Sequence, residues 1–318
     1  MATAGENPVS TPTVSVIIAN YNRADLLHEA ISSVSRQTYR DFELIVFDDG
    51  SQDHSLDVIA FHEEQMPENL RQLSHGKGVN RGIVATYLEA ISEARGKYVA
   101  FLENDDQWSP TYLEKKVDIL SNYPDVGVVF SPYKVLSDGW FGKDMMLRQW
   151  LLRITIKSGR PFDNFNNLLQ SNNVATFSCF MTRKCLLENL EVPPDHILAF
   201  DWWMLTQLST KSLFFLDNSS YTLWRWSRNS AIGSQRFKEH KNAGCNYMAL
   251  MYRQVESMNT QIPADKNETF NIYQENFSYF QSYYHDPSFR RFWAFFRRTP
   301  IWALAATASL VINFLKFR

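Results

Sequence analysis

An apolar run of strand length ends at three carboxylates that lie within four positions. Residues 98–102 read as a buried strand, Glu103, Asp105 and Asp106 follow, and Ser109-Pro110 opens a helix. Because side chains alternate along an extended chain, Glu103 and Asp105 can point the same way. Crowded carboxylates repel one another unless a cation lies between them, and hard divalent ions such as Mg²⁺ or Mn²⁺ prefer oxygen ligands. The cluster predicts a metal site with positions open to phosphate, or a solvated turn that leads into the next helix.

A separate acid interrupts a hydrophobic run. Asp201 stands within residues 199–205, whose other members are alanine, phenylalanine, two tryptophans, methionine and leucine. Burial of an unpaired carboxylate is costly, so an acid in this setting usually has a task. That task is either a helix N-cap or a general base.

Strand and helix patterns alternate along the chain and are expected to position these acids. Strands are predicted at residues 14–19, 43–47, 98–102, 126–131, 174–181, 213–216 and 221–226, and helices at 26–34, 55–64, 83–91, 110–122 and 238–259. Short connections between strand and helix imply right-handed crossovers. The expected fold class is therefore α/β, with a mostly parallel sheet covered by helices on both faces.

Three polar clusters fall at the ends of predicted strands. They are Asn20 to Arg23, Asp48 to Ser51 and Glu103 to Asp106. Open α/β sheets bind ligands at the carboxyl edge of their strands, so the clusters are expected to meet at one site. No Gly-x-Gly-x-x-Gly follows the first strand and no Walker lysine is present, which argues against a dinucleotide fold or a phosphate-loop NTPase.

Composition sets the broad class. The formal charge is −2, from 32 basic and 34 acidic residues, which offers no general attraction to nucleic acid. The three cysteines lack zinc-type spacing, and reduced thiols in a cytosolic setting are expected. Residues 1–12 read as a short disordered lead without signal-peptide character.

The C-terminal stretch is basic and aromatic. Residues 289–298 interleave arginine with phenylalanine and tryptophan, and residues 300–315 carry no charge. At about 1.5 Å per residue the uncharged stretch would measure about 24 Å as a helix, short of the ~30 Å hydrocarbon core. We expect a helical tail that lies on an anionic membrane surface, and the alternative is a helix docked on protein.

Several motifs together resemble family 2 glycosyltransferases with the GT-A fold, over roughly residues 13–230. The similar segments are residues 14–23, 37–39 with 42–46, 48–53, 80–82, and 96–98 leading to 101–106. The resemblance implies a Rossmann-like, mostly parallel sheet, a nucleotide-sugar donor, a Mn²⁺ or Mg²⁺ cofactor and an inverting displacement.

The resemblance also implies roles for individual residues. Asn20, Tyr21 and Arg23 would border the base and ribose, and Asp48 or Asp49 would accept a hydrogen bond from the base edge. Asn80 belongs to the segment that covers the donor, Asn104 and Asp105 stand in the Asp-x-Asp stretch, and Asp105 would bind the metal. Asp201 matches the catalytic base, and Trp202 or Trp203 would stack on the acceptor sugar, although such tryptophans are more often core. Lys77 and Arg225 are candidates for phosphate contacts or are solvated surface charges.

Departures from the family pattern are also visible. Glu103 replaces the usual first aspartate, Tyr87-Leu88 occupies the place of a common Arg-Asn pair, and Phe200 replaces an acid beside the base. Trp226 stands where a histidine is frequent. These changes bear on donor identity and metal geometry more than on the fold.

The expected protein is a metal-dependent, inverting hexosyltransferase of cell-surface polysaccharide synthesis. It would use a UDP-sugar and a glycan or lipid-linked acceptor, and would lie peripherally on the cytoplasmic face of the membrane, with no nucleic acid partner. A non-catalytic sugar-nucleotide or glycan-binding relative is the alternative. The expected organisation is the lead at residues 1–12, the GT-A domain at 13–230, a helical extension at 231–288 and the membrane-associating tail at 289–318.

Overall fold

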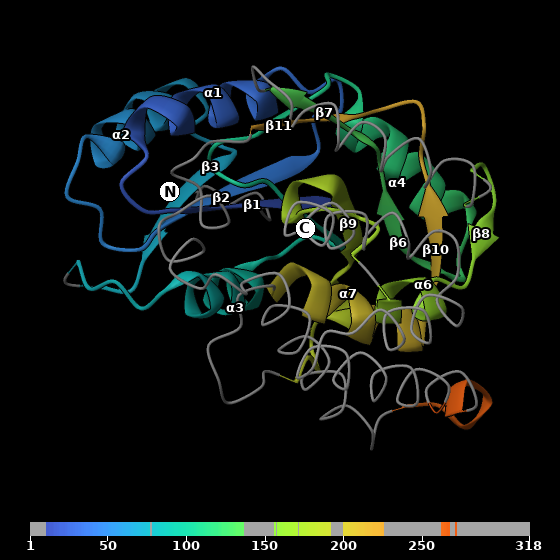
Figure 1. Cartoon of the computed structure of the whole chain (residues 1–318). Helices are drawn as coiled ribbons and strands as arrows, with labels where there is room; N and C mark the ends of the chain where they lie inside the picture. The colour runs from blue at the N-terminus through green and yellow to red at the C-terminus, as the bar shows by residue number, and fades with distance from the viewer. Residues whose placement is uncertain are drawn as a thin grey trace, which may run out of the picture.

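A central sheet between two layers of helices forms the body of the protein (Figure 1). The computed structural model describes residues 11–76, 78–136, 156, 158–170, 172–191, 200–225, 262–267 and 271. In this part of the chain eight strands form the main sheet, in the order β3-β2-β1-β4-β9-β6-β10-β8. Their bounds are β1 Val14–Asn20, β2 Phe42–Asp48, β3 Leu70–Ser74, β4 Tyr98–Phe101, β6 Val126–Phe130, β8 Pro161–Phe162, β9 Phe180–Arg183 and β10 Leu213–Leu216.

The sheet is mostly parallel. Strands β3, β2, β1 and β4 run in one direction, and β10 is parallel to β6. Strand β9 enters between β4 and β6 and is antiparallel to both, and β8 is antiparallel to β10. The expected fold class is therefore confirmed for the sheet and its helices.

Each face of the sheet has its own hydrophobic core. Helices α1 (Ala24–Ser35), α2 (Ser55–Gln65) and α4 (Tyr112–Asn122) pack on one face, and α3 (Ile83–Glu93), α6 (Phe165–Gln170) and α7 (Phe200–Lys211) on the other. Alternation along β1 serves both cores, because Val16 and Ile18 face the α1 side while Ile17 and Ala19 face the α3 side. Burial on both faces explains why this strand is apolar throughout.

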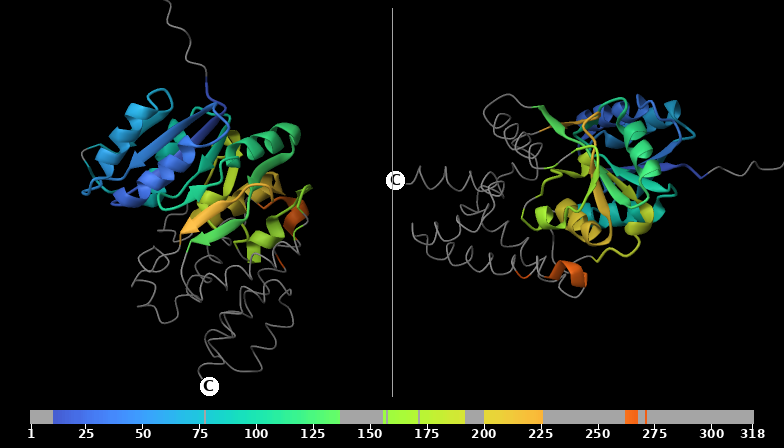
Figure 2. Two further views of the ribbon diagram at one scale, coloured as in Figure 1. Left: turned by 90° about the horizontal axis from the view of Figure 1, so that it is seen from above. Right: turned by 90° about the vertical axis from the view of Figure 1, so that its right-hand side faces the viewer.

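A second, three-stranded sheet joins distant parts of the sequence. It consists of β5 (Gln107–Trp108), β11 (Thr222–Arg225) and β7 (Tyr133–Leu136), with β11 antiparallel to β5 and parallel to β7. The left view of Figure 2 shows β7 and β11 side by side. This pairing carries Arg225 to the acidic turn that follows β4.

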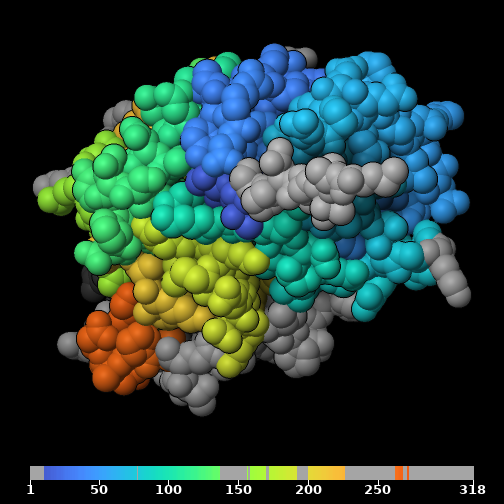
Figure 3. All heavy atoms as spheres, turned by 180° about the vertical axis from the view of Figure 1, so that it is seen from behind, coloured from blue at the N-terminus to red at the C-terminus, as the bar shows by residue number. Residues whose placement is uncertain are grey.

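A short segment from late in the chain packs onto α7. The Lys266 ammonium donates a hydrogen bond to the Ser209 carbonyl at 2.7 Å, and the Ile262 side chain is buried in the core on the α7 side. In Figure 3 residues 262–267, in orange, lie against the yellow surface that is formed by residues earlier in the chain.

The predicted elements and the observed ones agree closely in the first half of the chain. Strand β3 is not among the predicted strands, because only Leu70 of its five residues is fully buried. The strand expected at residues 174–181 begins later, at Phe180, after the 3-10 helix η1 (Phe177–Cys179). The helix expected at 238–259 and the tail at 289–318 lie outside the described residues, as do residues 1–10 of the lead. No helix within the described ranges has the length and apolar character needed to cross a membrane.

Candidate active site

Side-chain hydrogen bonds tie together the carboxyl ends of three neighbouring strands. The Asn20 amide at the end of β1 donates to Asp48 Oδ1 at 3.0 Å and to Ser51 Oγ at 3.2 Å, and the Asn104 amide donates to Asn20 Oδ1 at 2.9 Å. Strands β2, β1 and β4 lie next to one another in the sheet. The edge where the three polar clusters were expected to meet is therefore braced from one strand to the next.

The two adjacent aspartates after β2 have different positions. Asp48 is buried and holds its own turn, because its carboxylate accepts hydrogen bonds from Asn20 and from the Ser51 backbone and hydroxyl. It does not line the cavity described below. Asp49 does line it, and its two oxygens accept the backbone N–H groups of Arg81 at 2.7 Å and Gly82 at 2.9 Å. Of the two alternatives for contact with a base, the structure brings Asp49 to the cavity.

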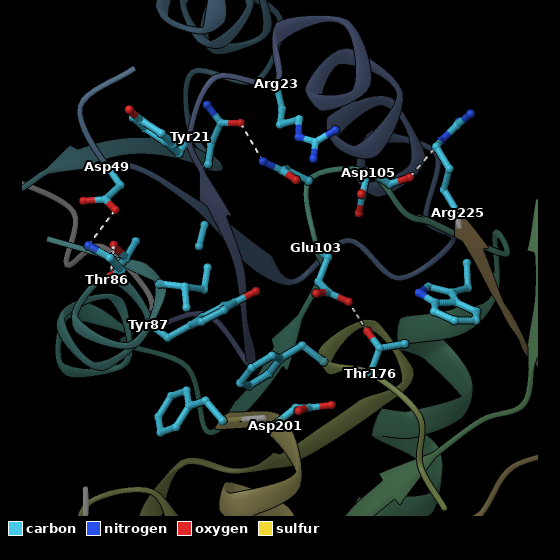
Figure 4. A pocket seen from close by; sticks show the side chains of 18 of the residues that line it. Tyr21, Arg23, Asp49, Thr86, Tyr87, Glu103, Asp105, Thr176, Asp201 and Arg225 are labelled. Carbon is cyan, nitrogen blue, oxygen red and sulfur yellow. Dashed lines mark hydrogen bonds between the residues drawn. The ribbon is translucent and has the colours of Figure 1, made fainter. Parts of the chain in front are cut away.

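A cavity of about 420 Å³ opens at this edge of the sheet. Figure 4 shows carboxylates on several sides of it: Asp49 from the turn after β2, Glu103 and Asp105 from the turn after β4, and Asp201 from α7. The residues predicted from the sequence that line this cavity are Asn20, Tyr21, Arg23, Asp49, Asn80, Glu103, Asn104, Asp105, Asp201 and Arg225. Asn20 and Arg225, 205 positions apart in the sequence, thus line one cavity. Lys77 lies outside the described residues.

Glu103 and Asp105 form the acidic centre of the cavity. Burial raises the pKa of Glu103 to about 8, and the neighbouring charge of Asp105 adds to the increase. The Thr176 hydroxyl donates a hydrogen bond to the Glu103 carboxylate. Burial also raises the pKa of Asp105, against the opposing effect of Arg23 and Arg225. Burial is thus the main cause of both raised pKa values, and the proximity of a second carboxylate adds to that of Glu103.

Asp106 has a different environment from Asp105. It is fully buried and does not line the cavity, and its Oδ1 accepts the backbone N–H of Arg225 at 2.8 Å. Burial, followed by the charges of Glu103 and Asp105, raises its pKa well above the ordinary value. The expectation that Asp106 coordinates the metal stays a prediction. Its Oδ1 holds strand β11 in place behind the cavity wall, and its buried Oδ2 has no hydrogen-bond partner among the described residues.

Arg225 is fixed by three contacts. Its Nε donates to the Asp105 carbonyl at 3.1 Å, one terminal nitrogen pairs with Glu29 at 2.5 Å, and its backbone N–H is bound to Asp106. Glu29 also accepts a hydrogen bond from the Gln107 amide at 2.6 Å. The guanidinium therefore lies beside the Asp105 turn in a defined orientation.

Asp201 lies in the first turn of α7 and borders the same cavity. The Asn172 amide donates to its Oδ2 at 2.9 Å. Burial raises the pKa of Asp201 to about 6, against hydrogen bonds from the Trp202 backbone and from Asn172. A carboxylate with a pKa near neutrality that faces a cavity has the properties of a general base.

Trp202 and Trp203 are core residues. Their side chains are 3% and 1% exposed, and their ring N–H groups donate to the carbonyls of Leu168 at 2.6 Å and Glu191 at 2.7 Å. Neither lines the cavity. The expected stacking on an acceptor sugar is corrected, because neither indole offers an open ring face.

Several cavity residues were not predicted from the sequence as site residues. Thr176, Phe177, Thr86 and Trp224 line the cavity beside the predicted residues. His75 lies behind Asp49, with a side chain that is 0% exposed. Their positions follow from the tertiary arrangement of η1, α3 and β11, and no local sequence pattern distinguishes them.

A divalent cation such as Mg²⁺ or Mn²⁺ needs several oxygen ligands. Among the described residues no group of three or more histidine, cysteine, aspartate or glutamate side chains is arranged as a metal site. Two crowded carboxylates at the cavity, Glu103 and Asp105, nevertheless fit a hard ion that takes its remaining ligands from phosphate and water. The side chains present are thus compatible with Mg²⁺ or Mn²⁺ bound together with a phosphate ligand.

A sheet of this order with an acidic cavity at its carboxyl edge defines a GT-A-like α/β protein. Solved structures agree: the mannosyltransferase PcManGT of Pyrobaculum calidifontis, in complex with GDP-Man and Mn²⁺, superposes with a TM-score of 0.55 at 15% identity, over 97% of this chain and 90% of that one. TarS 1-349 of S. aureus, in complex with UDP-GlcNAc, gives 0.53 at 14% identity, over 81% and 78%. At these identities the comparison concerns the fold.

The sequence comparisons identify the family. The model of glycosyl transferase family 2 matches residues 15–190, and the chain belongs to this family. An uncharacterized glycosyltransferase of Nostoc sp. is 40% identical over 116 residues, 36% of this chain and 35% of that protein. The UDP-Glc:alpha-D-GlcNAc-diphosphoundecaprenol beta-1,3-glucosyltransferase WfaP of Escherichia coli is 24% identical over 226 residues, 71% of this chain and 82% of that protein. The chain spans about a third of the length of the Nostoc relative and about half of an uncharacterized Mycobacterium tuberculosis relative, 52%.

Proposed function

We propose that this protein is an inverting, divalent-metal-dependent glycosyltransferase that moves a hexose from a nucleotide-diphosphate sugar to a hydroxyl of a glycan or lipid-linked acceptor. The observation that carries the proposal is that Asp49, Asp105 and Asp201 line one cavity although they come from three distant elements. A UDP-sugar is the proposed donor. The names of relatives support this choice, since WfaP is described as a UDP-Glc-dependent enzyme and TarS was solved with UDP-GlcNAc.

The nucleotide is proposed to bind along the ends of β1 and β2. Asn20, Tyr21, Arg23 and Asp49 would border the base and ribose there, with Asn80 covering them. Asn104 supports this wall by bracing Asn20. Arg225, and Lys77 outside the described residues, are the proposed cationic contacts for the diphosphate.

Glycosyl transfer requires that the negative charge of the diphosphate leaving group is neutralised and that the acceptor hydroxyl is activated as a nucleophile. Asp105, with Glu103 beside it, would hold the metal, which when bound supplies positive charge to the departing diphosphate. The acceptor oxygen forms a bond to the anomeric carbon as the carbon–oxygen bond to the phosphate breaks. Asp201 takes the hydroxyl proton on its carboxylate. Attack from the face opposite the leaving group inverts the anomeric configuration.

The expected role is in the synthesis of cell-surface polysaccharide at the cytoplasmic face of the membrane. The sequence of residues 289–318, which unites arginine and aromatic residues, supports a peripheral attachment to anionic lipid. The names of two relatives point the same way: WfaP is described as acting on an undecaprenol-linked sugar, and TuaG of Bacillus subtilis as a putative teichuronic acid glycosyltransferase.

The first test is a thermal-shift screen of UDP- and GDP-sugars with Mn²⁺, followed by transfer assays. A donor at a hundred times its dissociation constant stabilises the protein by about 2.7 kcal/mol. Asp105→Asn should abolish transfer and the Mn²⁺ dependence of donor binding, while Asp57→Asn, on the exposed surface of α2, should leave both intact. Unchanged transfer by Asp105→Asn would refute the proposal, and tight donor binding without turnover in the wild type would select a non-catalytic binding protein.

A further inference from the structure

Tyr87 occupies the wall of the cavity opposite the acidic turn. The residue belongs to α3 and lines the cavity although its side chain is only 1% exposed. The mechanism proposed above assigns it no task.

The ring of Tyr87 is held in one orientation by two phenylalanines. It stacks on Phe177 at a centroid distance of 4.3 Å and an interplanar angle of 25°, and it meets the edge of Phe101 at 5.8 Å and 79°. Phe101 is the last residue of β4, and Phe177 follows Thr176, the partner of Glu103. The ring is thus packed against the same elements that carry the acidic centre.

The hydroxyl of Tyr87 points into the cavity. Figure 4 shows its oxygen directed toward Glu103. No described residue forms a hydrogen bond with it, and it differs in this respect from the Tyr112 hydroxyl, which donates to the Ser178 carbonyl at 2.9 Å. Burial and the charges of Glu103, Asp106, Asp201 and Asp105 raise the pKa of Tyr87 well above its ordinary value, so the hydroxyl keeps its proton.

The position of this hydroxyl within the cavity indicates its ligand. In the proposed reaction the diphosphate lies at Asp105 and the acceptor hydroxyl at Asp201, so the transferred sugar must lie between these two residues. Tyr87 faces the same interval. A phenol can donate one hydrogen bond and accept another, which suits a sugar hydroxyl, whereas a phosphate is better bound by a cationic side chain.

We propose that Tyr87 is a specificity-determining residue whose hydroxyl binds a hydroxyl group of the transferred sugar. The inference rests on the proposed function and extends it to the sugar subsite. It implies that the sugar part of the donor contributes to affinity through this contact and that the nucleotide part does so independently.

The test compares Tyr87→Phe with the wild type. The variant keeps the aromatic packing on Phe101 and Phe177 and removes one oxygen. Dissociation constants are measured by calorimetry for UDP and for UDP-glucose, UDP-galactose, UDP-N-acetylglucosamine and GDP-mannose. Loss of one neutral hydrogen bond should weaken binding of the sugar nucleotide about three- to tenfold and leave binding of the free nucleotide unchanged. The KM for the donor should rise more than kcat falls.

Tyr98→Phe is the matched control, because Tyr98 is equally buried but lies on β4 with its ring in the core of the opposite face. Tyr98→Phe should leave the dissociation constants of UDP and of the sugar nucleotides unchanged. If Tyr87→Phe loses the same affinity for UDP as for the UDP-sugar, or loses affinity for neither, the inference is overturned.

A second measurement has one arm on wild-type protein, which does not depend on the folding of the variant. Wild-type protein should bind one deoxy analogue of its preferred donor about three- to tenfold more weakly than the parent sugar, and Tyr87→Phe should bind the two equally. If the wild-type protein binds UDP and every sugar nucleotide with equal affinity, the inference about Tyr87 is also overturned. The proposed function is judged by a different result, the transfer activity of the wild-type protein. Its failure can therefore be told apart from failure of the inference about Tyr87.

Discussion

The buried imidazole of His75 lies 3.3 Å from the carboxylate of Asp49 and 2.8 Å from that of Glu89. It also packs on the Phe47 ring at a centroid distance of 4.7 Å. The histidine therefore connects the turn after β2, where a nucleotide is proposed to bind, with helix α3.

His75→Gln is expected to loosen this connection. The substitution breaks the bridge between two carboxylates, so nucleotide affinity should fall about three- to tenfold and the free energy of unfolding by about 1–2 kcal/mol. Calorimetry with UDP and chemical denaturation measure the two effects. His54→Gln is the control, because the His54 side chain is 90% exposed. Unchanged affinity in His75→Gln would show that Asp49 is held adequately by the backbone of Arg81 and Gly82.

Gly50 should tolerate no side chain. Its φ is +80°, and a Cβ there would lie 2.5 Å from the Gly78 carbonyl oxygen. Gly50→Ala is expected to push the 78–82 segment away from Asp49, with a loss of about 2–4 kcal/mol in the free energy of unfolding and weaker donor binding. Gly76→Ala separates the two causes, since its φ is +70° and its position is open. Similar losses in both variants would mean that backbone strain dominates and that the contact between loops matters little.

The pH dependence of transfer should follow Asp201. Its pKa is about 6, so kcat/KM is expected to fall as the pH drops through that value and the base becomes protonated. A pH–rate profile on wild-type protein measures the acidic limb. An acidic limb centred near pH 4 would contradict the assignment of Asp201 as the base.

The same carboxylate should cost stability at neutral pH. Because its folded pKa lies above the ordinary value of 3.8, the folded protein binds the extra proton between about pH 4 and pH 6, and stability falls as the pH rises through this window. Asp201→Asn should therefore abolish transfer and yet stabilise the protein by on the order of 1–2 kcal/mol at pH 7.5, allowing for partial solvent screening. Denaturant titrations at pH 4 and pH 7.5 should show the gain at the higher pH alone.

Glu43 is a structural carboxylate with the opposite behaviour. It is 1% exposed and accepts hydrogen bonds from the Ser15 hydroxyl and from Arg71 and Arg95. These partners outweigh burial and lower its pKa, so its contribution is present at neutral pH and is lost as the pH falls through its folded value. Glu43→Gln should cost about 2–3 kcal/mol at pH 7. Glu93→Gln, an exposed partner of the same Arg71, should change stability by less than about 0.5 kcal/mol.

The sequence predicts the parallel part of the sheet well because its signal is local. Strands such as β1 and β2 are continuous apolar runs, and the polar residues after them mark the carboxyl edge. Asp201 can also be singled out from the sequence, since burial of an unpaired carboxylate within an apolar run is costly. These features depend on residues close together in the chain.

Other features depend on contacts between distant residues. Asp106 looks identical to Asp105 in the sequence, and only the pairing of β11 with β5 gives it the Arg225 backbone as a partner. Trp202 and Trp203 could be core residues or could stack on a sugar, and their residue type fits both roles. Only their burial against α6 and the segment around Glu191 identifies them as core residues. The bridging role of His75 depends on α3, which begins eight positions later.

The antiparallel strand β9 has a consequence for how the protein is made. It lies between β4 and β6, and the other neighbour of β6, strand β10, is later in the chain, so β6 has no partner in the main sheet until residues 180–183 have left the ribosome. The β1–β4 unit can assemble first, because synthesis is slow relative to local folding. Thr176 and Asp201 are synthesised well after that unit, and the substrate site is therefore completed only late in translation.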